Sequence, residues 1–187
     1  MNALVQPPRI QAVYSQWVSR SLGELNAIYL ARMLAAQAAG HSVLSGRLGL
    51  DEISFQNLLN HYFPTARFPV SAADPAPVAQ LDEQEAIARL LLSYRAGKEE
   101  SEVWIANIIA AGCAGAEHLW YDLGLWSRDD LQALIRQNFP ELVRKNHLNM
   151  KWKKFLYRQL CLETGVTLCR SPSCEACSDY EECFGPE

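Results

Sequence analysis

Hydrophobic side chains recur along this chain at the three- and four-residue spacing that places them on one face of a helix. In residues 82–95, for example, Ile87, Leu90, Leu91 and Tyr94 share one face. The same pattern predicts further helices at 22–39, at 100–112 and after an N-cap at Ser127. No segment shows the sustained alternation of a β-strand. The sequence therefore predicts an all-α fold.

A second regularity is a weak internal repeat. Residues 48–50 and 123–125 both read Leu-Gly-Leu, and each leads through an amphipathic stretch to a Phe-Pro pair, at 63–64 and 139–140. Two unrelated helices that end at Phe-Pro would give the same pattern by chance. Residues 64–80 hold four prolines, which is a linker composition. The predicted division is a helical domain at 1–168, with halves at about 9–64 and 82–147, and a separate irregular, cysteine-rich loop at 169–187.

A helix predicted at 150–162 carries the most basic part of the chain. Its apolar positions recur at helical spacing and should face the core. The stretch from 144 to 158 holds six Lys or Arg residues and no acid. A charge run of this kind is often a solvated face, but it can also attract an oxyanion, stabilise a negatively charged cluster or dock an acidic partner. One face of the helix carries Lys151, Lys154, Arg158 and Cys161.

Composition narrows the function classes. The 187 residues carry a net charge of −4, which argues weakly against nucleic-acid binding, because such domains are commonly basic. The most apolar windows, 25–39 and 103–116, are interrupted by polar residues and fall short of the roughly 20 apolar residues of a membrane span. The first residues do not resemble a signal peptide. We therefore expect a cytoplasmic protein, in which clustered cysteines bind metal more often than they form disulfides.

Four cysteines close to the C-terminus carry the most specific chemistry. Cys169, Cys174, Cys177 and Cys183 are spaced C-x4-C-x2-C-x5-C. Four thiolates suit zinc or an iron–sulfur cluster. A structural zinc site usually has two C-x2-C pairs separated by a longer loop, whereas this single pair flanked by lone cysteines can encircle a cubane. The spacing therefore favours an iron–sulfur cluster of the 4Fe–4S type over zinc, and it favours either of these over disulfides.

Three other residues are candidates for the same site. Cys113 lies in an Ala/Gly-rich stretch and His118 follows five residues later, across Gly115, so both can face one pocket. Cys161 lies shortly before the cysteine motif. Each has a plainer interpretation, because a lone cysteine is commonly a small core residue and a lone histidine is commonly structural.

Three strings in this order resemble the NifQ family of nitrogen-fixation proteins. They are the stretch His-Leu-Trp-Tyr-Asp-Leu-Gly-Leu at 118–125, the basic run at 149–161, and the cysteine motif with its ending Cys-Phe-Gly-Pro at 183–186. The resemblance is good over roughly 85–187 and looser before that. It implies a cytoplasmic protein that is not an enzyme but carries molybdenum in a Mo–Fe–S cluster.

The resemblance also implies a destination for the metal. Proteins of this family deliver molybdenum for synthesis of the iron–molybdenum cofactor of nitrogenase, and the implied recipients are the nitrogenase iron protein and the cofactor-assembly scaffold. The family's motif matches Cys169, Cys174, Cys177 and Cys183 without departure. No role for Cys113 or His118 comes from the resemblance.

Coordination chemistry adds a hypothesis of our own about molybdenum. Iron corners of a cubane bind thiolates, but molybdenum prefers six ligands and accepts harder nitrogen or oxygen donors, so four cysteines cannot complete its shell. We expect His118, with or without Cys113, to approach the molybdenum or to gate its release. We also expect the cationic face of Lys151, Lys154 and Arg158 to concentrate molybdate, a dianion, near the cluster.

Two alternatives remain open from the sequence. A helical DNA-repair glycosylase also ends in a four-cysteine loop, but the chain lacks a Gly-rich hairpin for phosphates and is acidic in bulk. The second alternative is a helical interaction module stapled by zinc. Catalysis is not expected, because no nucleophile–base pair, phosphate loop or dinucleotide motif is present.

Overall fold

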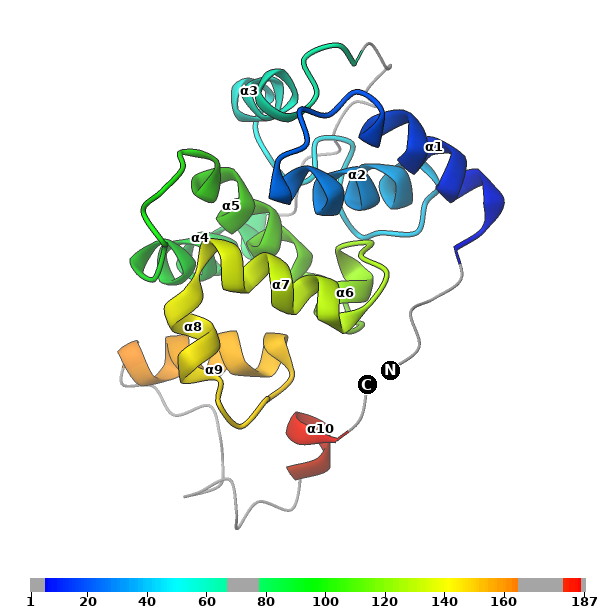
Figure 1. The fold of residues 1–187 in the computed structure, drawn as a ribbon. Coiled ribbons are helices and arrows are strands. Elements are labelled where there is room, and N and C mark those ends of the chain that lie inside the picture. Colours follow the sequence, from blue (N-terminus) through cyan, green and yellow to red (C-terminus); the bar gives the residue numbers. More distant parts are fainter. Residues whose placement is uncertain (1–5, 67–77, 165–179, 186–187) are drawn as a thin grey trace.

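The computed structural model describes residues 6–66, 78–164 and 180–185, and all regular structure in these ranges is helical (Figure 1). The prediction of an all-α fold is confirmed. The helices, in chain order, are α1 (Pro8–Val18), α2 (Leu25–Ala38), α3 (Glu52–Tyr62), α4 (Val78–Ser93), α5 (Ser101–Gly112), α6 (Leu119–Asp122), α7 (Arg128–Asn138), α8 (Pro140–Lys145), α9 (Trp152–Thr164) and α10 (Tyr180–Phe184).

Local signals explain where several helices begin. Ser127 caps α7 as predicted, because its side chain accepts from the Asp130 backbone N–H while the Asp130 carboxylate accepts from the Ser127 N–H, which together form a capping box. Asp51 caps α3 by accepting from the N–H groups of Ile53 and Ser54. The hydrogen bonds with Asp51 also lower the pKa of its carboxyl group.

Two differences from the sequence prediction concern the linker and the C-terminal loop. Helix α4 begins at Val78, so the last residues of the predicted linker 64–80 are helical. The C-terminal segment was expected to be irregular, yet its end forms α10. The remainder of the predicted loop, 169–179, lies outside the described residues. Both corrections concern short stretches in which the apolar pattern is too brief to indicate a helix.

The two halves of the repeat have matching helices. Helices α2 and α5 bury equivalent positions 75 residues apart, from Asn26 and Ala27 to Ser101 and Glu102 and onward through both helices. Helices α3 and α7 end at Phe63 and Phe139, whose φ/ψ angles are −137°/55° and −137°/59°. Helices α1 and α4 precede them and pack on α2 and α5 respectively. The repeat seen in the sequence therefore has a structural counterpart.

The two halves of the repeat contact each other closely at two glycines. Gly49 and Gly124 adopt positive φ angles of 82° and 78°. A Cβ atom at Gly49 would overlap the side chain of Ala111 on α5, and one at Gly124 would overlap that of Ala36 on α2. Each Leu-Gly-Leu turn is therefore packed on the central helix of the other half, in the closest approach that only glycine permits. Such reciprocal packing makes one continuous core.

A buried polar contact also joins the halves. The side-chain amides of Asn26 on α2 and Asn138 on α7 exchange two hydrogen bonds of 3.0 Å, and Asn26 also donates to the Tyr62 hydroxyl at 3.2 Å. All three side chains are buried. Because each buried amide has partners, the pair fixes the register of the two helices without leaving a polar group unsatisfied.

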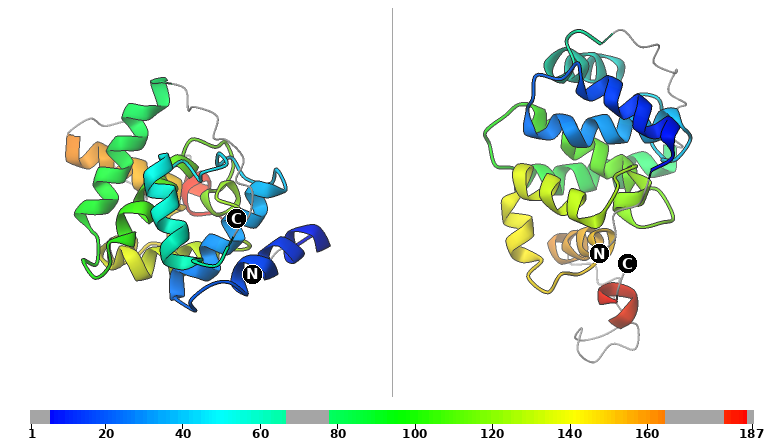
Figure 2. Two further views of the ribbon diagram at one scale, coloured as in Figure 1. Left: turned by 90° about the horizontal axis from the view of Figure 1, so that it is seen from above. Right: turned by 45° about the vertical axis from the view of Figure 1, so that its right-hand side comes forward.

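Helix α9 packs on the second half of the repeat, against α4 (Figures 1 and 2). Trp152, Phe155 and Leu156 are buried in the core, as the pattern predicted. The Trp152 indole donates to the Gln132 side chain of α7 at 3.0 Å. Helix α10 lies beyond the beginning of α9, away from α1–α3 (Figure 2).

No helix in the described part of the chain is long and apolar enough to cross a membrane.

Candidate metal centre

The first turn of α9 holds the end of the cysteine segment. We call residues 151–154 the α9 start. The Lys151 backbone N–H donates to the Cys183 carbonyl at 2.8 Å, and the Lys151 ammonium donates to the Glu181 carbonyl at 3.3 Å. Lys154 and Glu182 form an exposed ion pair at 3.8 Å. Cys183, the last residue of the four-cysteine motif, is half-buried and packs on the edge of the core.

The same turn holds a second segment through Lys153. The Lys153 ammonium donates to the Gly115 carbonyl at 2.8 Å and forms an ion pair with the Asp122 carboxylate. Asp122 is only 2% exposed and also accepts from the Glu117 backbone N–H at 3.1 Å. A Cβ atom at Gly115 would collide with the Asp122 carboxylate. Segment 115–122 is thus wrapped around one buried carboxylate, which Lys153 neutralises.

His118 lies within this wrapped segment. It occupies the N-cap position of α6, with extended backbone angles, but its side chain does not cap the helix. The residue is half-buried. The α9 start therefore connects two candidates that are 65 residues apart in the chain, since Lys151 contacts the residues around Cys183 and Lys153 contacts the segment that carries His118.

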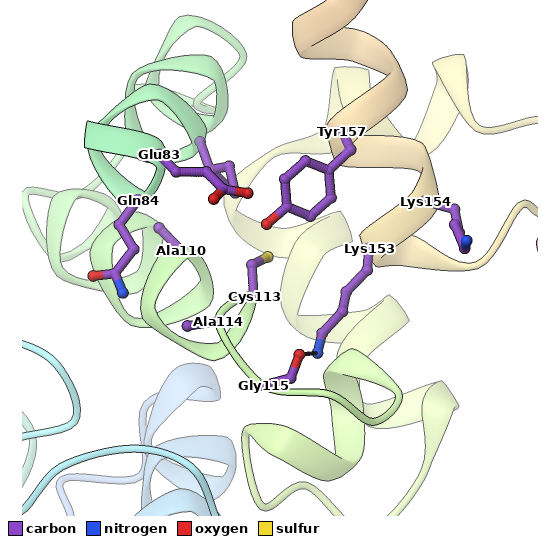
Figure 3. Close-up of a pocket in the computed structure, with 10 residues that line it drawn as sticks. Glu83, Gln84, Ala110, Cys113, Ala114, Gly115, Lys153, Lys154 and Tyr157 are labelled. Carbon is purple, nitrogen blue, oxygen red and sulfur yellow. Dashed lines mark hydrogen bonds between the residues drawn. The ribbon is translucent and has the colours of Figure 1, made fainter. Parts of the chain in front are cut away.

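A pocket of about 410 Å³ lies between α4, α5 and α9 (Figure 3). Cys113, the C-cap residue of α5, is 5% exposed and directs its sulfur into this pocket. The Tyr157 hydroxyl and the Glu83 carboxylate point toward the same region (Figure 3). The lining residues are Glu83, Gln84, Ile87, Ala110, Cys113, Ala114, Gly115, Lys153, Lys154 and Tyr157.

The surroundings of the pocket keep two groups protonated. Burial raises the pKa of the Cys113 thiol to about 12, against a smaller opposing effect of Lys153. Burial also raises the pKa of the Tyr157 hydroxyl, and the hydrogen bond that this hydroxyl donates to Glu83 adds to the rise. In the metal-free chain, Cys113 is therefore a neutral thiol at physiological pH and not a thiolate, which is the form that binds metals.

The remaining candidates are more scattered. Cys161 is half-buried in the last turns of α9, and ten residues of helix separate it from Lys151, or about 15 Å along the axis. Arg158 is exposed on α9 and does not line the pocket. Cys169, Cys174 and Cys177 lie outside the described residues. In the part of the chain that the structure covers, no three His, Cys, Asp or Glu side chains are grouped as a metal site.

Sequence reasoning missed Lys153, Asp122 and Tyr157. Lys153 was counted in the basic run, but its neighbours Lys151 and Lys154 were singled out instead. A signal for the buried pair was present, because Asp122 stands alone among the apolar residues of 119–125 and a buried carboxylate needs a partner. The chain gives no comparable signal for Tyr157, whose role depends on the position of α9 against α4.

Comparison with known proteins supplies the family. The model of one family, NifQ, matches residues 29–185 of the chain. This chain belongs to the NifQ family. It is 42% identical to the NifQ protein of Azotobacter vinelandii over 174 residues, which cover 87% of this chain and 89% of that relative. No solved structure matches the chain.

Further NifQ relatives agree with this assignment. The NifQ protein of Rhodobacter capsulatus is 41% identical over 159 residues, covering 84% of this chain and 87% of the relative. The NifQ homologue of Sinorhizobium fredii is 36% identical over 160 residues, which cover 85% of this chain and 70% of that relative. The resemblance stated from the three motifs is therefore confirmed, and with it the function in nitrogen fixation, the donation of molybdenum for synthesis of the iron–molybdenum cofactor. Molybdenum donation replaces the glycosylase and the interaction module as the function of the chain.

Proposed function

We propose that this chain carries molybdenum in a Mo–Fe–S cluster, as cargo held by Cys169, Cys174, Cys177 and Cys183, and releases it without acting as a catalyst. The observation that carries the proposal is the double attachment at the α9 start. One turn of helix fixes Cys183 through Lys151 and the His118 segment through Lys153. The four-thiolate donor set suits the iron of such a cluster.

Molybdenum needs ligands that the four cysteines do not supply. Its preference for six ligands leaves positions for nitrogen or oxygen donors. We propose that His118 occupies or gates one of them, because segment 115–122 is rigidly tied to the helix that also holds Cys183. Cys113 and Cys161 are weaker candidates. The Cys113 thiol is buried and protonated, and Cys161 lies toward the other end of α9.

The cationic face of α9 fits the same proposal. Lys151 and Lys154 contact α10 directly, next to Cys183, so their charges lie where an anionic cargo would be held. Arg158 extends this face by one turn. We propose that the three cations attract molybdate or an acidic partner surface. The proposed recipients are the nitrogenase iron protein and the cofactor-assembly scaffold, in a cytoplasmic setting.

The test is metal analysis of the anaerobically isolated chain. The proposal expects iron, acid-labile sulfide and molybdenum in the protein, with the broad visible absorption of an iron–sulfur cluster. Cys169→Ser should lose cluster iron and molybdenum together. A colourless protein that contains zinc in place of iron would contradict the proposal.

A second experiment tests His118. His118→Ala should retain iron and sulfide but lose a large part of its molybdenum, because only the molybdenum needs the additional donor. His147→Ala is the matched control, since His147 is exposed in the loop between α8 and α9, where its ring lies 3.2 Å from the Lys145 carbonyl oxygen. Normal molybdenum loading and transfer in His118→Ala would remove the histidine from the site.

A further inference from the structure

Helix α10 is too short to be stable by itself. It has five residues, Tyr180–Phe184, whereas an isolated helix needs roughly 12–15 residues to be even marginally stable in water. The ring stack of Tyr180 on Phe184, at 4.4 Å, and the hydrogen bond from the Gly185 N–H to the Glu181 carbonyl are local contacts. The helix therefore depends on its docking against the α9 start, beyond which it lies (Figures 1 and 2).

The facing ends of α9 and α10 satisfy each other's backbone groups. Lys151 directly precedes the first residue of α9, so its N–H finds no partner within that helix. Cys183 lies in the last turn of α10, where carbonyl groups are likewise left without helical partners. The Lys151 N–H donates to the Cys183 carbonyl at 2.8 Å. The position of a motif cysteine therefore depends on the docking of α10.

Further contacts across this junction are electrostatic and open to solvent. The Lys151 ammonium donates to the Glu181 carbonyl at 3.3 Å, and Lys154 pairs with Glu182 at 3.8 Å. The side chains of this ion pair are 54% and 71% exposed. Exposed ion pairs contribute little to stability and are screened by salt. Phe184 adds apolar packing at the edge of the core but is only half-buried. The acidic α10 is therefore bound weakly to a basic turn, at charges that an external anionic group can reach.

We propose that α10 is a latch on the α9 start, and that an acidic segment of the protein that receives molybdenum displaces it. Carboxylates of that segment replace Glu182 on Lys154 and offer Lys151 a charged acceptor in place of a neutral carbonyl, which gives a stronger hydrogen bond. Displacement also breaks the bond between the Lys151 N–H and the Cys183 carbonyl, so Cys183 leaves the α9 start. Binding of the acceptor is thereby coupled to release of the cargo. This coupling rests on the proposed function, whereas the latch itself does not.

Hydrogen exchange of the Lys151 amide, followed by nuclear magnetic resonance in the full-length, metal-free chain, tests the latch. The Cys183 carbonyl protects this amide, so its exchange rate reports undocking of α10. Raising sodium chloride to about 1 M, where the screening length is about 3 Å, should accelerate exchange. We expect roughly two- to fivefold, the range of an exposed ion pair.

Charge variants identify the contact that holds the latch. Lys154→Glu should accelerate exchange of the Lys151 amide at low salt by a similar factor, because it places a carboxylate beside Glu182. The double variant Lys154→Glu with Glu182→Lys should restore the parental rate, because the ion pair is reversed but intact. Lys145→Glu on α8 makes the same change in net charge and should alter exchange less than about 1.5-fold.

A hexaglutamate peptide serves as the probe for an acidic segment. At matched ionic strength it should accelerate exchange of the Lys151 amide more than sodium chloride does, whereas a hexaglutamine peptide should have no such effect. With the anaerobically isolated, cargo-bound chain, hexaglutamate should also lower the fraction of molybdenum that stays with the protein through gel filtration. Lys154→Glu should retain less molybdenum than the parent even without peptide.

The outcomes separate the latch, its displacement and the proposed function. Exchange that is unchanged by salt and by Lys154→Glu, or that the double variant fails to restore while helical content stays native, would overturn the latch. An effect of hexaglutamate no larger than that of sodium chloride would overturn displacement by an acidic segment. Unchanged molybdenum retention while the latch opens would overturn the coupling to release. A chain that shows the exchange effects but never binds iron or molybdenum would overturn the proposed function and leave the latch intact.

Discussion

At the scale of single residues, the buried pair of Lys153 and Asp122 organises the site more than any candidate ligand does. Asp122 accepts from Lys153 and from the Glu117 backbone, and Lys153 also binds the Gly115 carbonyl. The sequence indicated His118 by its five-residue spacing from Cys113 across Gly115, but it did not indicate which residue would hold the segment that carries it. That information depends on the distance between two elements far apart in the chain.

Removal of one partner of the Lys153–Asp122 ion pair should destabilise the fold. Asp122→Ala leaves the Lys153 ammonium, whose side chain is only 16% exposed, without its counter-charge, and we expect a loss of about 3 kcal/mol in the free energy of unfolding. The measurement is urea denaturation. The exposed Arg144–Glu141 pair on α8 is the control, because Arg144→Ala should cost less than about 1 kcal/mol. Equal losses in the two variants would contradict the buried-pair interpretation.

Alkaline stability tests the environment of Cys113. The thiol has an ordinary pKa of 9.0 and a pKa of about 12 in the folded chain, so the unfolded state loses its proton first as the pH rises. The stabilising contribution is therefore complete below pH 9 and is lost between pH 9 and 12. Lys153, Glu83 and Asp122 are the charged groups that act on it.

The loss of stability at alkaline pH is large enough to measure in the metal-free chain. Between pH 8 and pH 10, the parent should lose about 1 kcal/mol more than Cys113→Ala in the free energy of unfolding. Urea denaturation at the two pH values gives both numbers. Each protein is compared with itself at the two pH values. The loss of stability caused by the cavity in Cys113→Ala is therefore the same at both values and cancels. Parallel losses in parent and variant would show that the thiol is not buried as described.

At the scale of elements, the internal repeat was readable from the sequence and the end of the chain was not. The Leu-Gly-Leu turns and Phe-Pro ends repeat because two equivalent helix pairs need the same turn and the same stop. Helix α10 has five residues, too few for periodicity to indicate it, and it is held by contacts with the α9 start. The second half differs from the first by the docking of α9, which covers the end of α5 and creates the pocket.

The crossed glycine contacts give a test of the repeat. Gly49→Ala and Gly124→Ala should each lower the free energy of unfolding by about 3 kcal/mol, because each adds a positive-φ penalty and a collision with a helix of the other half. Gly97→Ala measures the positive-φ penalty alone, without a collision. Gly97 has a φ of 70° and open space around its Cβ position, so we expect a loss of about 1 kcal/mol. Thermal or urea unfolding compares the three variants, and a Gly97→Ala loss as large as the others would contradict the reciprocal packing.

At the scale of the whole molecule, the two halves of the repeat form the helical core, and the basic helix α9 packs on its second half. Both halves contribute to the core, whereas the described candidate residues of the metal site lie on α9 and on the segments that the α9 start contacts. Sequence comparison alone establishes the NifQ family and molybdenum donation. The sequence motifs predicted the thiolate donors, but they did not predict that one helical turn would join the cysteine segment to His118.

The most direct test of the central claim is a molybdenum-edge X-ray absorption spectrum of the anaerobically isolated, full-length chain. The proposal predicts sulfur neighbours around molybdenum, iron in the next shell, and at least one lighter donor that disappears in His118→Ala and persists in His147→Ala. A spectrum of molybdenum surrounded only by oxygen, with no iron neighbour, would contradict a Mo–Fe–S cargo.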